Sequence, residues 1–454
     1  MTSNIMEIVN KINSVLWGPL MILLLLGTGL MYSIRLRFLQ VTKLGTAARQ
    51  IFGKKEDKSD AEGLSPFQSL TTAIAAQVGT GNLAGVATAI AAGGPGAIFW
   101  MWISGFLGMA TIFAEAVLAQ LFNEEREGVL TGGPAYYISK GLKSKFLAGF
   151  FAISIVLALG IMGNIVQSNS IVTAVKNAAP KIPPLAVGIV IAILAGLIFI
   201  GGISRIGSFT EKVVPIMASL YILGGLAIVI INIDMLLPAL KMIIYGAFNP
   251  KAATGGLIGA TIKESIRYGI ARGLFSNEAG MGSTPHAHAV AKVDHPVQQG
   301  LVSIIGVIVD TGVVCTITAL VILTTGVLGS GLTGAELTQE GFRVGLSGIT
   351  SNLGLQFIAV SLFFFAFSTI IGWYFFGEQN IKYLFGNKGV FFYRILVLAG
   401  IVIGALLEVE LVWSLADMFN ALMVIPNLIA LVGLSSLVVK ATKEFNEKYE
   451  KKIR

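Results

Sequence analysis

The chain has 454 residues, of which 55% are hydrophobic and only 12% are charged, and its mean hydropathy is +0.81. A soluble domain carries about 25% charged residues, so this composition indicates an integral membrane protein, with no sign of a separate soluble domain. The net charge of +8 is not a nucleic-acid signal, because the basic residues lie between apolar segments. The single cysteine, Cys315, excludes an internal disulfide and any multi-cysteine metal site.

Apolar segments of membrane-spanning length recur along the whole chain. A hydrocarbon core about 30 Å thick needs about 20 apolar residues per helix, and this length predicts an all-α protein with eleven spans in a single membrane domain, residues 1–454. The predicted spans run approximately over residues 15–34, 66–92, 97–122, 147–174, 185–203, 210–232, 256–283, 297–328, 354–376, 391–407 and 411–439. The first lacks a clean small-x-small cleavage site, so it is interpreted as a retained span rather than a signal peptide.

Basic residues are unevenly distributed between the two sets of loops. When the loops are assigned alternately to the two sides, most of the 32 lysines and arginines share a side with the 35–65 loop and the tail, residues 440–454. The positive-inside rule then places the N-terminus outside the cell and the C-terminus in the cytoplasm.

Two of the predicted spans are interrupted by glycine-rich polar runs. The first run is QVGTGN, Gln77 to Asn82, and the second is ARGLFSNEAGMGS, Ala271 to Ser283. Backbone polar groups freed from a helix in lipid cost several kcal/mol each, so such a break persists only where it is buried or lines a cavity.

The two breaks open two equal halves of the chain. Setting the first span aside leaves five spans in residues 66–232 and five in residues 256–439. An odd number of spans per half makes the halves run in opposite directions, which predicts an inverted repeat. Broken helices at corresponding positions of such repeats indicate the substrate and ion site of a transporter. A lone Gly-x-Gly is more often a helix-packing feature, and the pairing favours a site instead.

The first break offers two kinds of backbone group. A helix that restarts after Gly79, Thr80 and Gly81 presents free N–H groups and the positive end of its dipole, which suit a carboxylate. Carbonyls from Ala75 to Val78 are free to meet a cation, and Gln77 and Asn82 add amide oxygens.

Two sequence runs resemble a known family. The break Val78 to Asn82 is similar to the V-G-x-G-N of the leucine-transporter architecture, and GGPGAIFWMW, Gly93 to Trp102, closely resembles the signature of the alanine or glycine:cation symporter (sodium:alanine symporter) family of the amino acid–polyamine–cation superfamily. Gly105 departs slightly, since that pattern usually has another small residue there. The resemblance covers essentially the whole chain, including SNEAGMGS, Ser276 to Ser283.

The resemblance implies a transporter of the cell membrane and no enzyme. It implies uptake of alanine and glycine driven by Na⁺ or protons, with Na⁺ as the expected coupling ion. Its implied substrate set is Gln77, Gly79, Thr80, Gly81, Asn82, Gly273, Phe275, Ser276 and Asn277.

Two sodium positions follow from the same resemblance. One uses Asn82 and Ser276, and the other uses the carbonyls of Ala75 and Val78 with the hydroxyls of Ser368 and Thr369. Hydroxyls in membrane helices often bond their own i−4 carbonyl, so the Ser368–Thr369 pair alone is a weak signal.

Three further polar or aromatic residues are candidates for the pocket. Asn164 and Gln167 share a helix face at i, i+3, and either pocket lining or interhelical hydrogen bonding would explain them. Trp373 lies one turn beyond Thr369, where it either anchors at the interface or walls a small pocket.

Acidic residues inside predicted spans are costly and suggest function. Asp310 either binds a cation, carries a proton, or pairs with Arg272 or a backbone amide; Glu278 and Glu115 are similar cases. His286, His288 and His295 lie together but lack a zinc motif.

Secondary active transport by alternating access is therefore the leading interpretation, with the lipid bilayer and a small amino acid as partners and a monomer as sufficient. Proton-coupled or exchange transport of the same amino acids is the alternative. The sequence leaves open the sodium stoichiometry, the preference between D- and L-alanine, and the oligomeric state.

Overall fold

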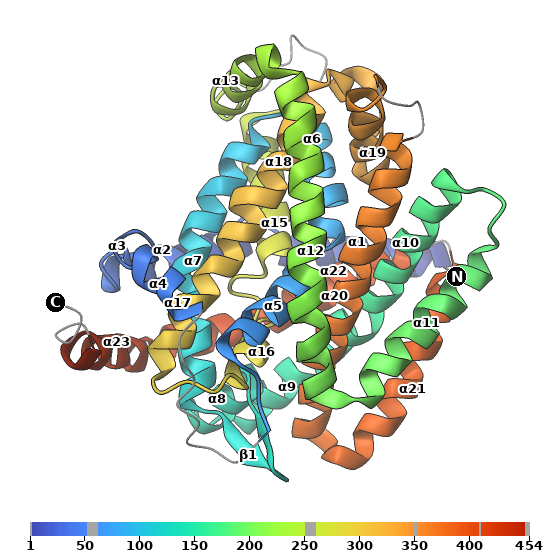
Figure 1. Ribbon diagram of the computed structural model, residues 1–454. Coiled ribbons are helices and arrows are strands. Elements are labelled where there is room, and N and C mark those ends of the chain that lie inside the picture. Colours follow the sequence, from blue (N-terminus) through green and yellow to red (C-terminus); the bar gives the residue numbers. More distant parts are fainter. Residues whose placement is uncertain (1, 52–61, 250–259, 349–352, 408–409, 450–454) are drawn as a thin grey trace.

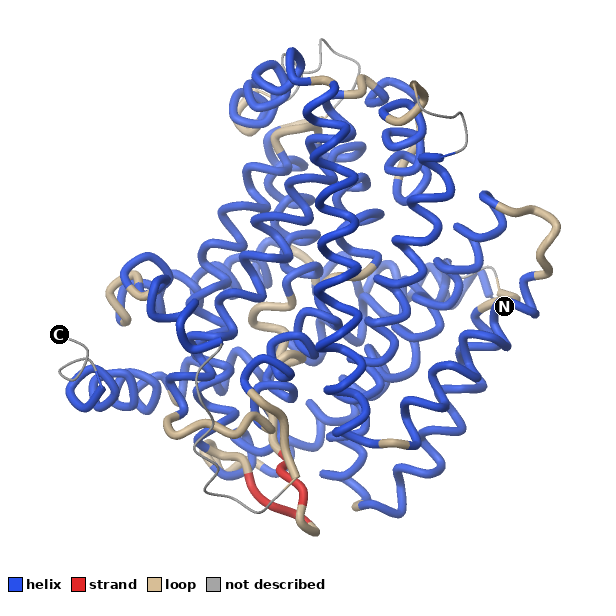
Figure 2. The backbone as a smooth tube through the Cα atoms, in the orientation of Figure 1, coloured by secondary structure: helices blue, strands red, loops and turns tan. Residues whose placement is uncertain are grey.

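The computed structural model describes residues 2–51, 62–249, 260–348, 353–407 and 410–449, and these are almost entirely helical (Figures 1 and 2). In chain order the described helices are α1 (Thr2–Leu16), α2 (Pro19–Arg35), α3 (Leu39–Thr42), α4 (Leu44–Ile51), α5 (Pro66–Gln77), η1 (Gly81–Gly85), α6 (Val86–Gly93), α7 (Ala97–Leu121), α8 (Pro134–Lys140), α9 (Lys145–Ile155), η2 (Val156–Gly163), α10 (Asn164–Ala178), α11 (Pro184–Ile200), α12 (Gly202–Ile231), η3 (Ile233–Met235), α13 (Leu236–Gly246), α15 (Ile262–Asn277), α16 (Pro285–Ala289), α17 (Pro296–Val307), η4 (Ile308–Cys315), α18 (Thr316–Thr324), η5 (Val327–Ser330), α19 (Gly334–Gly345), α20 (Leu353–Phe385), α21 (Asn387–Gly404), α22 (Glu410–Gly433) and α23 (Ser435–Tyr449). A short antiparallel hairpin, β1 (Glu124–Arg126) with β2 (Val129–Thr131), connects α7 to α8.

Among the described helices, seven are long and apolar enough to cross a membrane, or nine if two bent helix pairs each count as one span. The shorter apolar helix α11 and the helix α15 lie at the two remaining predicted spans; the predicted start of the latter, residue 256, falls outside the described residues. A helix therefore lies at every predicted span, while eleven crossings and the inverted repeat stay predictions.

Two predicted boundaries differ from the structure at the ends of the chain. The first span was expected from residue 15, but a 40° bend separates α1 from α2 where Gly18 and Pro19 follow each other. Proline is accepted at the first helical position because its missing N–H has no partner there, so α2 begins at Pro19. The last span was expected to reach residue 439, but α22 ends at Gly433 and α23 follows.

The first predicted break is a bend of 50° between α5 and the helical segment of residues 81–93. A capping box starts α5: the Ser65 hydroxyl accepts from the Gln68 backbone, and the Gln68 side chain accepts from the Ser65 backbone. The second predicted break, Ala271 to Ser283, starts later than expected. Residues Ala271 to Asn277 continue helix α15, and the chain leaves the helix at Glu278, where Glu278, Gly280 and Gly282 all have positive φ.

The core of the molecule contains three π-helical segments: η1, η2 and η4. A π-helical turn widens a helix locally and is common at functional sites. Segment η1 contains Asn82, η4 contains Asp310, and the two segments contact each other.

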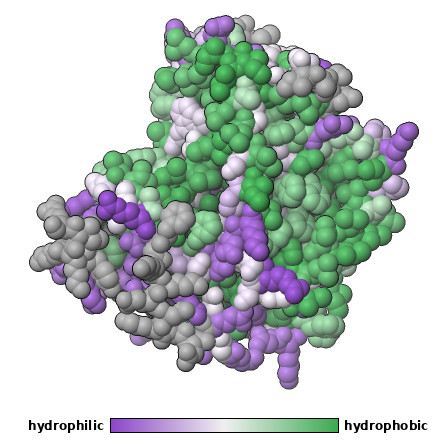
Figure 3. All heavy atoms as spheres, in the orientation of Figure 1, coloured by the Kyte–Doolittle hydropathy of each residue, from purple (hydrophilic) through white to green (hydrophobic). Residues whose placement is uncertain are grey.

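Large apolar side chains cover much of the outer surface. Exposed examples lie on α11, α12 and α21, among them Leu197, Leu223 and Phe392. Figure 3 shows apolar side chains over the right-hand part of one face, where Figure 1 places α11 and α21. This is the surface that a bilayer covers.

Candidate functional site

The two breaks lie against each other in the centre of the molecule. The Gln77 side-chain amide donates to the Asn277 carbonyl over 2.7 Å. A Cβ added to Gly81 would come within 3.3 Å of the Ser276 Cα atom, so only glycine allows this approach without a shift. Residues about 200 positions apart thus form one polar centre.

The first break is stabilised from within its own sequence. The Asn82 side-chain oxygen accepts the Gly79 N–H over 2.8 Å, which closes the turn between the two half-helices. Gln167, from α10, donates to the Thr80 hydroxyl over 3.1 Å. Thr80 and Asn82 thus lie in a compact group around the break, and Gln167 makes an interhelical hydrogen bond to it.

Oxygen atoms gather where α20 crosses the end of α5. The Thr369 hydroxyl lies 3.0 Å from the Ala75 carbonyl and 3.5 Å from the Val78 carbonyl. The Ser368 hydroxyl lies 3.4 Å from the Ala75 carbonyl, and both hydroxyls also contact the Phe365 carbonyl. Both hydroxyls thus bond a carbonyl of their own helix, as hydroxyls in membrane helices often do, in addition to approaching the Ala75 carbonyl. These are the hard oxygen atoms that an alkali cation binds.

A second oxygen-rich group surrounds Asp310. Its carboxylate accepts from the Asn82 amide at 2.5 Å, from the Ser276 hydroxyl at 2.9 Å and from the Thr311 hydroxyl at 2.7 Å. Among the described residues no lysine or arginine pairs with this buried carboxylate, so the proposed Arg272 partner is not in contact with it. Asp310 joins one residue from each break.

The second break depends on residues from other helices. Glu115, in α7, accepts the Gly280 N–H at 3.0 Å and the Gly282 N–H at 2.9 Å. Asn427, in α22, donates to Glu115 at 2.6 Å and to the Gly280 carbonyl at 2.9 Å. Glu115 therefore accepts hydrogen bonds from two backbone N–H groups that the end of the helix leaves without helical partners.

Glu278, in the second break, and Trp373, in α20, form a buried pair. The Trp373 indole N–H donates to Glu278 over 2.7 Å, and the Ser283 hydroxyl donates to its other oxygen over 2.5 Å. The indole ring fills the space beside Gly163, where an added Cβ would lie 2.6 Å from a ring carbon. The Trp373 side chain therefore extends from α20 and packs against the π-helical segment η2.

Three predicted residues have contacts outside this centre. Asn164 donates to the Gly160 carbonyl of its own helix. Gly273 packs so closely on α7 that an added Cβ would lie 2.4 Å from the Ser104 hydroxyl. His286 contacts the Ser283 carbonyl and Asn380, and no group of three potential metal-ligating side chains occurs in the part of the chain that the structure describes.

A cavity of about 380 Å³ leads from one side of the molecule to the first break. Its lining includes Thr80, Gly81, Arg272, Phe275, Trp413 and Asp417. Arg272 and Asp417 bring opposite charges to its walls. Sequence analysis missed Asp417 and Trp413, although a lone acid in an apolar span was the signal that identified Asp310.

The N-terminal helix α1 completes the wall of an adjoining cavity of about 260 Å³. The Asn13 amide donates to the Ser414 carbonyl over 2.8 Å, and the Trp17 indole donates to the Asp417 carbonyl over 2.9 Å. The first helix and the last long helix are thus joined beside the cavity.

Comparison with known proteins identifies the family of this chain. The model of the sodium:alanine symporter family matches residues 2–454. The chain belongs to this family. The chain is 45% identical over 450 residues to the sodium/alanine symporter AgcS of Methanococcus maripaludis, covering 97% of each protein. It is 43% identical over 441 residues to the probable sodium/glutamine symporter GlnT of Bacillus subtilis, covering 97% of this chain and 90% of GlnT.

The fold is shared with a solved structure of the leucine-transporter type. The crystal structure of MhsT in complex with L-phenylalanine matches with a TM-score of 0.58 at 15% identity, covering 86% of this chain and 93% of MhsT. Members of the sodium:alanine symporter family are transporters and not enzymes, so this chain is a cation-coupled amino-acid transporter of the membrane.

Proposed function

We propose that the protein couples the inward movement of Na⁺ to the uptake of alanine and glycine by alternating access. The observation that carries this proposal is the meeting of the two breaks, Gln77 with Asn277 and Gly81 with Ser276, at the end of an open cavity. The relative named for alanine and the relative named for glutamine both support a neutral amino acid as substrate, and the relative named for alanine supports a small one.

The substrate would lie between the two breaks. Its carboxylate would meet the N–H groups at the start of η1, near Thr80 and Gly81, where the helix dipole favours negative charge. Phe275 faces the cavity side of this position and Gln167 holds Thr80 from the other side. We expect the substrate side chain to pack against Phe275, which lines the cavity, so leucine and phenylalanine should be poor substrates, because overpacking costs about 1–3 kcal/mol.

Two oxygen groups suit the coupling cation. One combines the carbonyls of Ala75, Val78 and Phe365 with the hydroxyls of Ser368 and Thr369. The other combines Asn82 and Ser276 with Asp310, whose carboxylate would balance the charge of a cation. A cation next to the substrate carboxylate would make each ligand tighten the binding of the other, which is the requirement for coupling.

The position of the cavity supports a direction for the proposed cycle. The basic loops predict an outside N-terminus and a cytoplasmic C-terminus, and the cavity adjoins α1 at the N-terminal end. In this orientation the cavity would open to the outside of the cell, and the single domain would consist of one extra first span and two inverted halves of five.

The deciding experiment is alanine binding to purified protein with Na⁺, or with K⁺ or choline at the same ionic strength and pH. Binding that requires Na⁺ supports the proposal. Binding that is independent of Na⁺ but follows pH would favour proton-coupled or exchange transport, with Asp310, Glu278 or Glu115 as the titrating group. Binding of neither alanine nor glycine would contradict the substrate assignment.

A further inference from the structure

A layer of paired backbone lies at the end of the molecule opposite the cavity. Segment 62–64, just before α5, lies between strand β2 and segment 290–292, just after α16. The Glu62 N–H donates to the Gly128 carbonyl at 2.7 Å, and the Leu64 N–H donates to the Val290 carbonyl at 2.9 Å. An added Cβ on Gly63 would lie 2.9 Å from both the Val290 carbonyl and Leu130, so the layer is tightly packed.

This layer connects the two broken helices to α7. The Gln120 side chain, at the end of α7, donates to the His288 carbonyl at 2.6 Å and to the Ala291 carbonyl at 2.8 Å. The next polar side chain, Asn123, donates to the Ala289 carbonyl at 2.8 Å. The start of α5, the end of α16 and the hairpin therefore form one unit, which we call the backbone layer: residues 62–64, 120–131 and 286–292.

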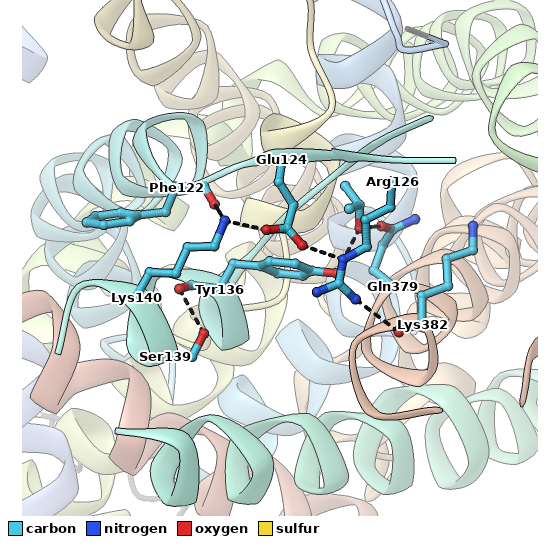
Figure 4. Close-up of polar contacts among 9 residues, drawn as sticks. Phe122, Glu124, Arg126, Tyr136, Ser139, Lys140, Gln379 and Lys382 are labelled. Atoms are coloured by element: carbon cyan, nitrogen blue, oxygen red, sulfur yellow. Dashed lines mark hydrogen bonds and ion pairs between the residues drawn. The ribbon is translucent and has the colours of Figure 1, made fainter. Parts of the chain in front are cut away.

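The contacts between the backbone layer and the ends of α20 and α21 are of a different kind. The Thr131 hydroxyl donates to Gln379 at 2.6 Å, and the Arg126 guanidinium donates to the Lys382 carbonyl at 3.5 Å (Figure 4). The Asn387 amide donates to Glu127. Every one of these contacts uses a side chain. We call this contact surface, between β1–β2 and residues 379–387, the seam.

The seam also contains space. A cavity of about 180 Å³ lies along it, lined by Arg126, Glu127, Thr131, Lys382 and Asn387 among others. Backbone pairing in the layer leaves no such gap at Gly63. The molecule is therefore less densely packed along the seam than within the layer.

Arg126 is held in place by an ion-pair group on its own side of the seam. Glu124 pairs with Arg126 and, at 2.5 Å, with Lys140, and the guanidinium lies 5.3 Å from the centre of the Tyr136 ring (Figure 4). Burial opposes ionisation of Glu124, but the bonds from Lys140 and Arg126 outweigh it and hold the pKa of Glu124 below its ordinary value of 4.5. This group is therefore charged at neutral pH.

We propose that the seam is the cytoplasmic closure that parts when the transporter opens inward, while the backbone layer moves as a single piece. The inference rests on the proposed function and its orientation. A closure that must break and re-form in each cycle is better made of side-chain contacts than of backbone pairing. The exposed Arg126–Lys382 and Asn387–Glu127 contacts exchange partners with water at little net cost, whereas the buried Thr131–Gln379 bond has to be hydrated when the seam parts. The layer carries the inner ends of both broken helices, so its movement would open a path to the breaks.

The test compares two cysteine pairs joined by the same short bis-maleimide. The seam pair is Glu127→Cys with Asn387→Cys, both exposed; the control pair within the layer is Glu62→Cys with Val129→Cys, which face each other in one bridge. The native Cys315 is 1% exposed and should not react. In proteoliposomes, cross-linking the seam should abolish sodium-dependent alanine uptake, and cross-linking the layer should leave most of it. Unchanged uptake after seam cross-linking, or equal loss from both pairs, would overturn the proposal.

A second readout does not need a substrate. Thr284 is fully buried between the second break and α16, so a Thr284→Cys variant should react with a maleimide only when the cytoplasmic side opens. Adding Arg126→Ala should speed this labelling several-fold, whereas Lys145→Ala, which removes an exposed charge at the start of α9, should not. Equal labelling rates would count against the seam. If no variant takes up alanine but Arg126→Ala still speeds labelling, the substrate assignment fails and the seam stands.

Discussion

The two breaks look alike in the sequence and are stabilised in different ways. The first is closed by its own Asn82, three residues beyond the N–H that it accepts. The second uses Asn277 for the Ala279 N–H but needs Glu115 from α7 for two more, and three of its residues have positive φ. A break of the first kind is self-contained and lies open to the cavity. A break of the second kind is held by the surrounding helices, so its disruption should affect the whole fold.

The largest expected effect comes from Glu115→Leu. It leaves the N–H groups of Gly280 and Gly282 buried without acceptors, at a cost of about 1–3 kcal/mol each. Thermal unfolding of the purified protein should shift markedly downward. Glu115→Gln keeps one acceptor oxygen and should fall between the variant and the parent. If the Glu115→Leu protein were as stable as the parent, the second break would not depend on Glu115, and the proposed difference between the two breaks would be wrong.

Asn82→Ala should damage function more than stability. It removes the acceptor of Gly79 and a donor to Asp310, but the altered residues lie at the cavity end of a self-contained turn. Losing a hydrogen bond to a charged group costs about 1.5–3 kcal/mol, so alanine or sodium binding should weaken about tenfold or more. Binding titrations beside the same unfolding assay would separate the two effects, and a stability loss equal to that of Glu115→Leu would contradict the comparison.

Gly79→Ala should weaken sodium binding without a general loss of folding. The added Cβ would lie 2.4 Å from the Thr369 hydroxyl and would push it away from the Ala75 and Val78 carbonyls. Gly85→Ala is the matched control, since its Cβ would meet only an Arg272 side-chain carbon at 4.0 Å. The sodium concentration for half-maximal alanine uptake should therefore rise for Gly79→Ala and stay unchanged for Gly85→Ala.

The smallest effects should distinguish the two hydroxyls of α20. Thr369→Val removes the hydroxyl that lies 3.0 Å from the Ala75 carbonyl, and Ser368→Ala removes the one at 3.4 Å. We expect both to raise the sodium concentration for half-maximal uptake, and Thr369→Val to raise it more. A larger effect from Ser368→Ala than from Thr369→Val would indicate that the cation does not bind at the Ala75 carbonyl.

The sequence predicted the breaks better than the contacts that stabilise them. Glycine runs in apolar spans identify both breaks, and the hydroxyls of Ser368 and Thr369 were expected near Ala75 and Val78, where the structure has them. Glu115 was recognised only as a costly buried charge, because its partners are N–H groups 165 and 167 residues away. Backbone pairing of the kind seen at 62–64 has no residue signature, so no pattern could have predicted it.

The contact of α1 with α22 has a consequence for how the protein is made. Asn13 and Trp17 bind carbonyls that lie 401 and 400 residues later in the chain. During synthesis the cavity wall stays incomplete until α22 has left the ribosome and entered the bilayer. A chain cut short before α22 would leave the Asn13 amide and the Trp17 indole without these two carbonyl acceptors. Completion of the cavity is thus one of the last steps in the folding of the chain.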